Sequence, residues 1–148
     1  MWLESGQQIS QVDVSDILIL SSSVKVVESA RDLGVIIDSQ LSLSLHVAAL
    51  CRFGFFHLRQ LRPLCRSLPA EATKTLVQAF ISCCLDYCNS LLYGVTDKLM
   101  RQVQLAHNAA ARLITGAKRR EHITPTLRQL HWLPVRRRVE FKMASLIY

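Results

Sequence analysis

The chain has 148 residues, of which half are hydrophobic and a fifth are charged, and this composition excludes a disordered chain and predicts one folded domain with a sizeable core. The net charge of +7 is unevenly divided: residues 1–50 hold two basic and six acidic side chains, giving −4, whereas residues 51–148 hold sixteen basic and five acidic ones, giving +11. A polyanionic partner would therefore meet the second part of the chain.

The first forty residues are expected to form short strands. Residues 17–20 and 24–27 are apolar runs separated by three serines, which predicts a β-hairpin. Residues 33–37 are apolar on both faces, so we expect a third strand that is covered on each side.

The apolar period then becomes helical. One helix is predicted to end before Pro63, and a second to begin at Pro69, with a short helical piece over 85–92 that Gly94 stops. The stripe expected to be buried on the first helix is Leu43, Val47, Leu50, Gly54, Leu58 and Leu61. On the second it is Ala72, Leu76, Ala79, Phe80 and Cys83.

The best-marked helix is predicted to begin after Thr96, a suitable N-cap, and to end at Gly116. Two further helices are expected from Thr124-Pro125 and from Leu133-Pro134. The buried stripe predicted after Thr96 is Leu99, Val103, Ala106, Ala110 and Leu113, with Arg101, Gln104, Asn108 and Arg112 on the free side. For the last helix the stripe is Val135, Val139, Met143 and Leu146.

These elements predict a mainly α fold with a small N-terminal antiparallel β-hairpin or meander. The chain shows no secretory leader and no C-x-x-C pair among its five cysteines. A membrane span over residues 75–96 would bury Asp86 near its centre, which costs about 2.5–3.5 kcal/mol. We therefore expect an intracellular protein, cytoplasmic or nuclear, without a membrane span.

Several segments carry a recognisable pattern in a fixed order. They are Leu33-Gly34-Val35 within residues 31–38, and then residues 55–62, 85–94, 104–114, 122–125 and 130–136. Each is short, but they keep the same order along nearly the whole chain. This succession resembles the C-terminal palm-edge and thumb region of LINE-type (non-LTR retrotransposon) reverse transcriptases.

The resemblance implies a division of the chain. Residues 1–40 would be a β remnant of the polymerase palm edge, with Leu33 and Gly34 near the primer terminus. Residues 41–148 would be a helical thumb-like domain, truncated at its C-terminus because the last helix runs to Tyr148 without a stop signal. The partner that the family implies is RNA or an RNA–DNA duplex.

Catalysis by this chain is not expected. The family's paired metal-binding aspartates would lie upstream, and the sequence contains no Asp-Asp pair. Phosphoryl transfer of this kind needs carboxylates that hold two metal ions. We therefore expect no enzymatic activity, no cofactor, no metal and no small-molecule substrate.

The basic residues of the second part are the candidate nucleic-acid contacts, because a fixed positive charge releases counterions and the guanidinium fork suits phosphate oxygens. The alternative is an ordinary solvated surface. The candidates are Arg101, Arg112, Lys118, Arg119, Arg120, Arg128, Arg136, Arg137 and Arg138.

Two other motifs have competing interpretations. Cys84 and Cys88 lie one helical turn apart and could join His107, His122 or His131 in a zinc site, but buried helix cysteines explain them better. Likewise, Trp132 could stack on a base, although core packing is favoured. A second hypothesis for the whole chain is a helical protein-interaction module, to which Phe141 and Ile147 would contribute apolar surface.

Overall fold

The computed structural model describes residues 15–147, and the chain divides into two units, Met1–His46 and Val47–Tyr148. The division falls close to the boundary expected after residue 40. Residues 1–14 of the predicted β unit, and Tyr148 at the end of the last helix, lie outside the described part.

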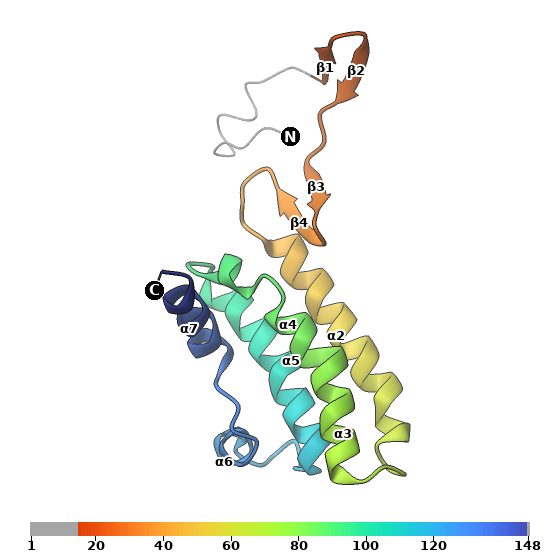
Figure 1. The fold of residues 1–148 in the computed structure, drawn as a ribbon, viewed down its shortest axis with the longest axis vertical. Helices are drawn as coiled ribbons and strands as arrows, with labels where there is room; N and C mark the ends of the chain where they lie inside the picture. Colours follow the sequence, from red (N-terminus) through yellow and green to blue (C-terminus); the bar gives the residue numbers. More distant parts are fainter. Residues whose placement is uncertain (1–14, 148) are drawn as a thin grey trace. The chain divides into compact units, whose positions relative to one another are not determined.

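The first unit contains two antiparallel hairpins (Figure 1). Strands β1 (Asp16–Ile19) and β2 (Ser22–Lys25) form the predicted hairpin, with Ile19 opposite Ser22. Strands β3 (Ser29–Asp32) and β4 (Val35–Asp38) form the second, with Asp32 opposite Val35. The sequence predicted β4 but not its partner β3, which contains three polar residues in four.

Leu33 and Gly34 are the two-residue turn between β3 and β4. Both have positive φ angles, 43° and 85°, as a type I′ turn requires at its two central positions. Glycine adopts this conformation without strain, whereas leucine does not. The expectation that residues 33–37 are one continuous strand is therefore wrong, because its first two residues turn the chain.

Helix α2 (Ser44–Leu64) confirms the first predicted stripe except for Leu43, which is buried but precedes the helix with a φ of 56°. The helix extends past its expected end and includes Pro63. A proline in the last turn removes one hydrogen bond but leaves the preceding turns intact.

Helix α3 (Ala70–Val77) continues through a π-helical turn η1 (Gln78–Ser82) into α4 (Cys83–Asp86). The stripe predicted here is wrong: Ala79, Phe80 and Cys83 are exposed. The displacement begins before the π turn, because Ala72 and Leu76 are only half-buried. The residues buried instead, spaced by four, are Thr73, Val77, Ile81 and Leu85.

After α4, Cys88 adopts a left-handed conformation and a 3₁₀ turn η2 (Asn89–Leu92) leads to α5 (Asp97–Thr115). The predicted ends of α5 are confirmed, since Thr96 is the N-cap and Gly116 closes the helix with a φ of 71°. Gly54 lies where α2 meets α5, and a Cβ there would be in ordinary van der Waals contact with the Cβ of Ala106, at 3.8 Å.

The buried stripe of α5 is broader than predicted. Val103, Ala106 and Ala110 are buried as expected, whereas Leu99 and Leu113 are only half-buried. The other buried residues of this helix are Met100, His107 and Ala111. Helices α2, α3 and α5 lie side by side in the helical unit (Figure 1).

Helix α6 (Ile123–Gln129) begins after His122, whose Nδ1 accepts a hydrogen bond from the Thr124 amide at 3.4 Å. The predicted start at Thr124-Pro125 is thus slightly late. Helix α7 (Val135–Ile147) begins as predicted after Pro134, but Leu146 is exposed and Met143 is half-buried. The second half of α7 therefore has little cover.

The mainly α fold with a small antiparallel β part is confirmed. Among residues 15–147, no helix is long and apolar enough to cross a membrane.

Candidate nucleic-acid interface

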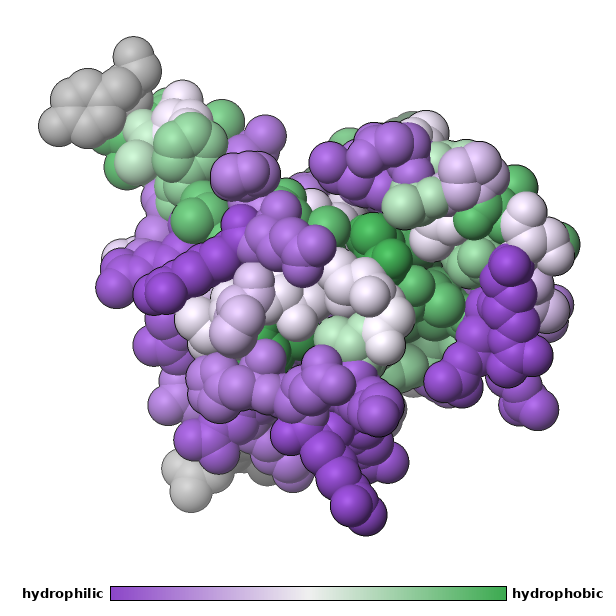
Figure 2. Space-filling model, turned by 90° about the horizontal axis from the view of Figure 1, so that it is seen from below, coloured by the Kyte–Doolittle hydropathy of each residue, from purple (hydrophilic) through white to green (hydrophobic). Residues whose placement is uncertain are grey.

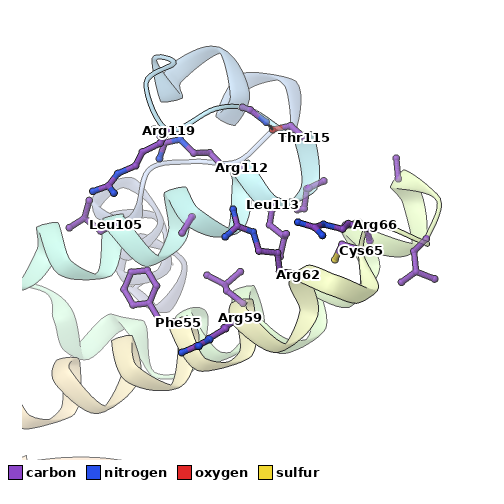
Figure 3. Close-up of a pocket in the computed structure, with 18 residues that line it drawn as sticks. Phe55, Arg59, Arg62, Cys65, Arg66, Leu105, Arg112, Leu113, Thr115 and Arg119 are labelled. Carbon is purple, nitrogen blue, oxygen red and sulfur yellow. Dashed lines mark hydrogen bonds between the residues drawn. The ribbon is translucent and has the colours of Figure 1, made fainter.

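A groove of about 1060 Å³ lies between the C-terminal halves of α2 and α5, closed at one end by the loop after Gly116. Figure 3 shows arginine side chains from both helices and from this loop around the groove. The arginines that line the groove are Arg59, Arg62, Arg66, Arg112 and Arg119. Among the lining residues there is no aspartate or glutamate.

These guanidinium groups are largely unpaired. Within the described part of the chain, Arg59, Arg62, Arg66 and Arg119 form no ion pair and no side-chain hydrogen bond. Arg112 is half-buried and donates from Nη2 to the Glu121 carbonyl at 3.3 Å. The groove thus holds a concentration of positive charge that the described part of the protein does not neutralise.

The walls of the groove are apolar below the arginines. Phe55 from α2 is 47% exposed and Leu105 from α5 is 60% exposed, although both line the cavity. Figure 2, which looks from below Figure 1, shows purple hydrophilic side chains beside exposed green apolar ones. The further apolar lining residues are Leu58, Leu68, Leu113 and Ile114.

The three consecutive arginines of α7 are in a different state, because each has an acidic partner. Arg136 pairs with Asp97 at the start of α5. Arg137 Nη1 lies 2.7 Å from Glu140 Oε2, and Arg138 Nη1 lies 2.9 Å from Asp86 Oδ1. Arg136 and Arg137 are exposed, whereas the Arg138 side chain is only 21% exposed.

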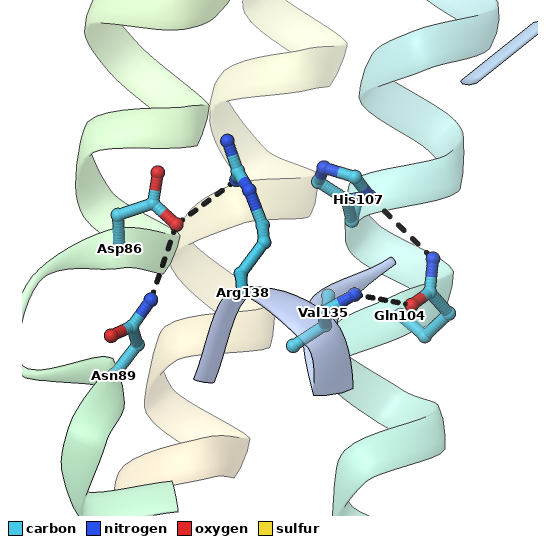
Figure 4. A network of polar contacts seen from close by, with 6 residues as sticks. All are labelled: Asp86, Asn89, Gln104, His107, Val135 and Arg138. Carbon is cyan, nitrogen blue, oxygen red and sulfur yellow. Dashed lines mark hydrogen bonds and ion pairs between the residues drawn. The ribbon is translucent and has the colours of Figure 1, made fainter. Parts of the chain in front are cut away.

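Arg138 belongs to a polar network beneath α7 (Figure 4). Asp86 also accepts a hydrogen bond from Asn89 Nδ2 at 3.4 Å. Burial raises the pKa of the Asp86 carboxyl, and Arg138, the Asn89 hydrogen bond and Lys142 offset part of that rise. Arg138 therefore compensates a half-buried carboxylate, and its guanidinium group already has an acidic partner.

Gln104 completes this attachment of α7. Its Oε1 accepts a hydrogen bond from the Val135 amide at 2.8 Å, while its Nε2 donates to Asn108 Oδ1 at 2.7 Å. Val135 is the first residue of α7, where amides lack partners within the helix. The sequence placed Gln104 on the free side of α5, but its side chain caps another helix.

The His131-Trp132 motif is a packing element. Trp132 is buried, and its ring lies 4.9 Å from the ring of His107, which has no exposed surface. Burial, and then the charge of Arg138, lower the pKa of His107 to about 4. Core packing of Trp132 is thus confirmed over base stacking.

The remaining predicted contacts are dispersed. Arg101, Lys118, Arg120 and Arg128 are exposed and form no ion pair within residues 15–147, but they do not line the groove. Leu33 and Gly34 belong to the hairpin unit. Of the basic residues predicted from sequence, Arg112 and Arg119 are the two in the groove.

The sequence analysis missed Arg59, Arg62 and Arg66. Their spacing of three and four residues places them on one side of α2, along the edge of the apolar stripe. The spacing of these arginines is visible in the sequence, but the sequence does not show that this side of α2 lies next to α5.

The cysteines show no sign of a metal centre. All five are free thiols, and burial, followed by the neighbouring Cys83, raises the pKa of Cys84. Between residues 15 and 147, no group of three His, Cys, Asp or Glu is placed to hold a metal ion.

Comparison of the chain with models of protein families, with curated proteins and with solved structures gives no match.

Proposed function

We propose that this chain is a non-catalytic fragment related to the palm edge and thumb of a LINE-type reverse transcriptase, and that it binds RNA or an RNA–DNA duplex without regard to sequence. The ordered succession of family-like segments supports the origin. The absence of an Asp-Asp pair from the sequence supports the lack of polymerase activity.

The observation that carries the binding proposal is the groove between α2 and α5. It gathers five arginines and no lining carboxylate, and none of these arginines has an acidic partner in the described structure. Phosphate oxygens match such groups in charge and geometry. Binding would occur in the cytoplasm or nucleus, where RNA is present and thiols stay reduced.

The salt dependence of binding tests this proposal. Fluorescence anisotropy with labelled RNA of unrelated sequences should give similar affinities that fall steeply as salt rises, because bound phosphates release counterions. Absence of binding at low salt, or an affinity indifferent to salt, would refute the phosphate contacts.

A second candidate function is protein interaction through α7. Phe141 is 67% exposed and Ile147 is 75% exposed on the poorly covered half of this helix. Association through such a surface would persist at high salt, since hydrophobic contact does not depend on counterion release. Light scattering across a salt series separates this behaviour from nucleic-acid binding.

A further inference from the structure

We infer that the groove between α2 and α5 accepts a single strand of nucleic acid in preference to a duplex, with a base placed against Phe55. This inference rests on the proposed function and specifies its substrate. The groove has apolar walls, a volume that exceeds one nucleotide unit, and basic residues beyond both of its ends.

The apolar walls distinguish single strands from duplexes. Phe55 and Leu105 present exposed apolar surface inside a groove rimmed by arginines (Figure 3). A duplex stacks its bases internally and offers phosphates and sugars to a concave protein surface. An unpaired strand can place phosphates on the rim and a base on the phenylalanine ring, as basic grooves with aromatic platforms do.

The size of the groove agrees with this occupant. A volume of about 1060 Å³ slightly exceeds the roughly 300–1,000 Å³ of small-molecule pockets. It is large enough for more than one nucleotide unit, whereas the full width of a duplex would contact only the rim.

The charge also continues beyond the groove. Arg52 lies seven residues before Arg59 and Arg101 eleven before Arg112, so each occupies the same side of its helix as the groove arginine. At the far end, Lys118 and Arg120 flank Arg119. A long polyanion can follow this line of charge, whereas a short acidic peptide would use only its centre.

The test compares one strand in two states. A labelled uridine strand of ~12 nucleotides is titrated alone and as one arm of a hairpin whose other arm is a complementary run of adenosines. Known single-strand binders hold ~4–16 nucleotides per domain, so this length is sufficient. We expect the single strand to bind about tenfold more tightly at ~0.1 M salt.

Phe55→Ala should lower single-strand affinity about tenfold and leave duplex affinity within about twofold, because the loss is of base stacking. The matched control is Phe56→Ala, since Phe56 is 58% exposed on the same helix and does not line the groove. Phe55→Trp should retain single-strand affinity. Circular dichroism of each variant checks that the helices are intact.

Each alternative outcome is distinct. The single-strand inference would be overturned if the single strand and the duplex bound with equal, salt-dependent affinity and Phe55→Ala changed neither affinity. The proposed function would still stand in that case. Competition by polyglutamate as effective as uridine strands of equal charge would also overturn it. No binding to either state would refute both the inference and the proposed function.

Discussion

Two sets of arginines in the helical unit are used in opposite ways. Arg136, Arg137 and Arg138 are adjacent in sequence and each pairs with a carboxylate. Arg59, Arg62 and Arg66 are spaced along α2 and have no acidic partner in the described structure. A run of basic residues therefore does not by itself identify a surface for a polyanion, because distant acids can neutralise it.

The positions of the acids explain the difference. Asp97 and Asp86 stand at the start of α5 and the end of α4, where α7 docks. The groove between α2 and α5 has no lining carboxylate. Arg136 and Arg138 thus attach α7 to neighbouring helices, and the α2 arginines are available to a ligand.

Among the variants that test how the α7 attachment differs from the groove, Trp132→Ala is expected to change the free energy of unfolding most. Trp132 packs on His107 beneath the start of α7, and truncating a buried tryptophan costs about 3–5 kcal/mol. Urea denaturation should show that loss, while nucleic-acid affinity per folded molecule stays unchanged. If nucleic-acid affinity fell while stability did not, Trp132 would be a binding residue and not a packing residue.

Arg138→Ala should have an intermediate effect. It leaves the half-buried Asp86 without its cationic partner, at a cost of about 1–3 kcal/mol. The control Arg137→Ala removes an exposed pair and should change the free energy of unfolding by less than about 1 kcal/mol. If the two variants were equally stable, Arg138 would not be an attachment residue.

The pH dependence of stability gives a smaller effect. The pKa of His107 is lowered to about 4 in the folded state, against about 6.5 when unfolded. Between these values the unfolded chain binds the extra proton, so stability falls as pH drops and is about 2 kcal/mol lower at pH 5 than above pH 7.

His107→Phe should remove this dependence. Burial raises the pKa of the Asp86 carboxyl, so its contribution to stability falls as pH rises, opposite to the contribution of His107. The substitution leaves this Asp86 contribution in place. Chemical denaturation of both proteins at several pH values isolates the histidine. Identical pH profiles would show that His107 is protonated equally in both states.

The sequence predicted helices more successfully than side-chain partners. The α2 stripe and the ends of α5 follow from local periodicity and capping, and both are confirmed. The α3 stripe was wrong by one residue, since Thr73 and Val77, and not Ala72 and Leu76, are the buried positions already before the π turn at Gln78–Ser82. Strand β3 was missed because its pairing depends on a turn with a leucine at positive φ.

The candidate interface depended on tertiary contacts that periodicity does not contain. Gln104 is bonded to Val135, 31 residues away, and Arg136 to Asp97, 39 residues away. No local pattern gives the partner of either side chain. The side of α2 that carries Arg59 could be predicted, whereas the groove required the position of α5.

The most direct test of the account is a comparison of salt slopes. Arg59, Arg62 and Arg66 are changed together to Gln in one variant, and Arg136 and Arg137 in another. If each groove arginine meets a phosphate of a single strand, the first variant should lower the slope of log affinity against log salt by about two. The second should leave the slope nearly unchanged. An equal or larger fall in the α7 variant would contradict the central claim that the groove arginines, and not those of α7, contact the ligand.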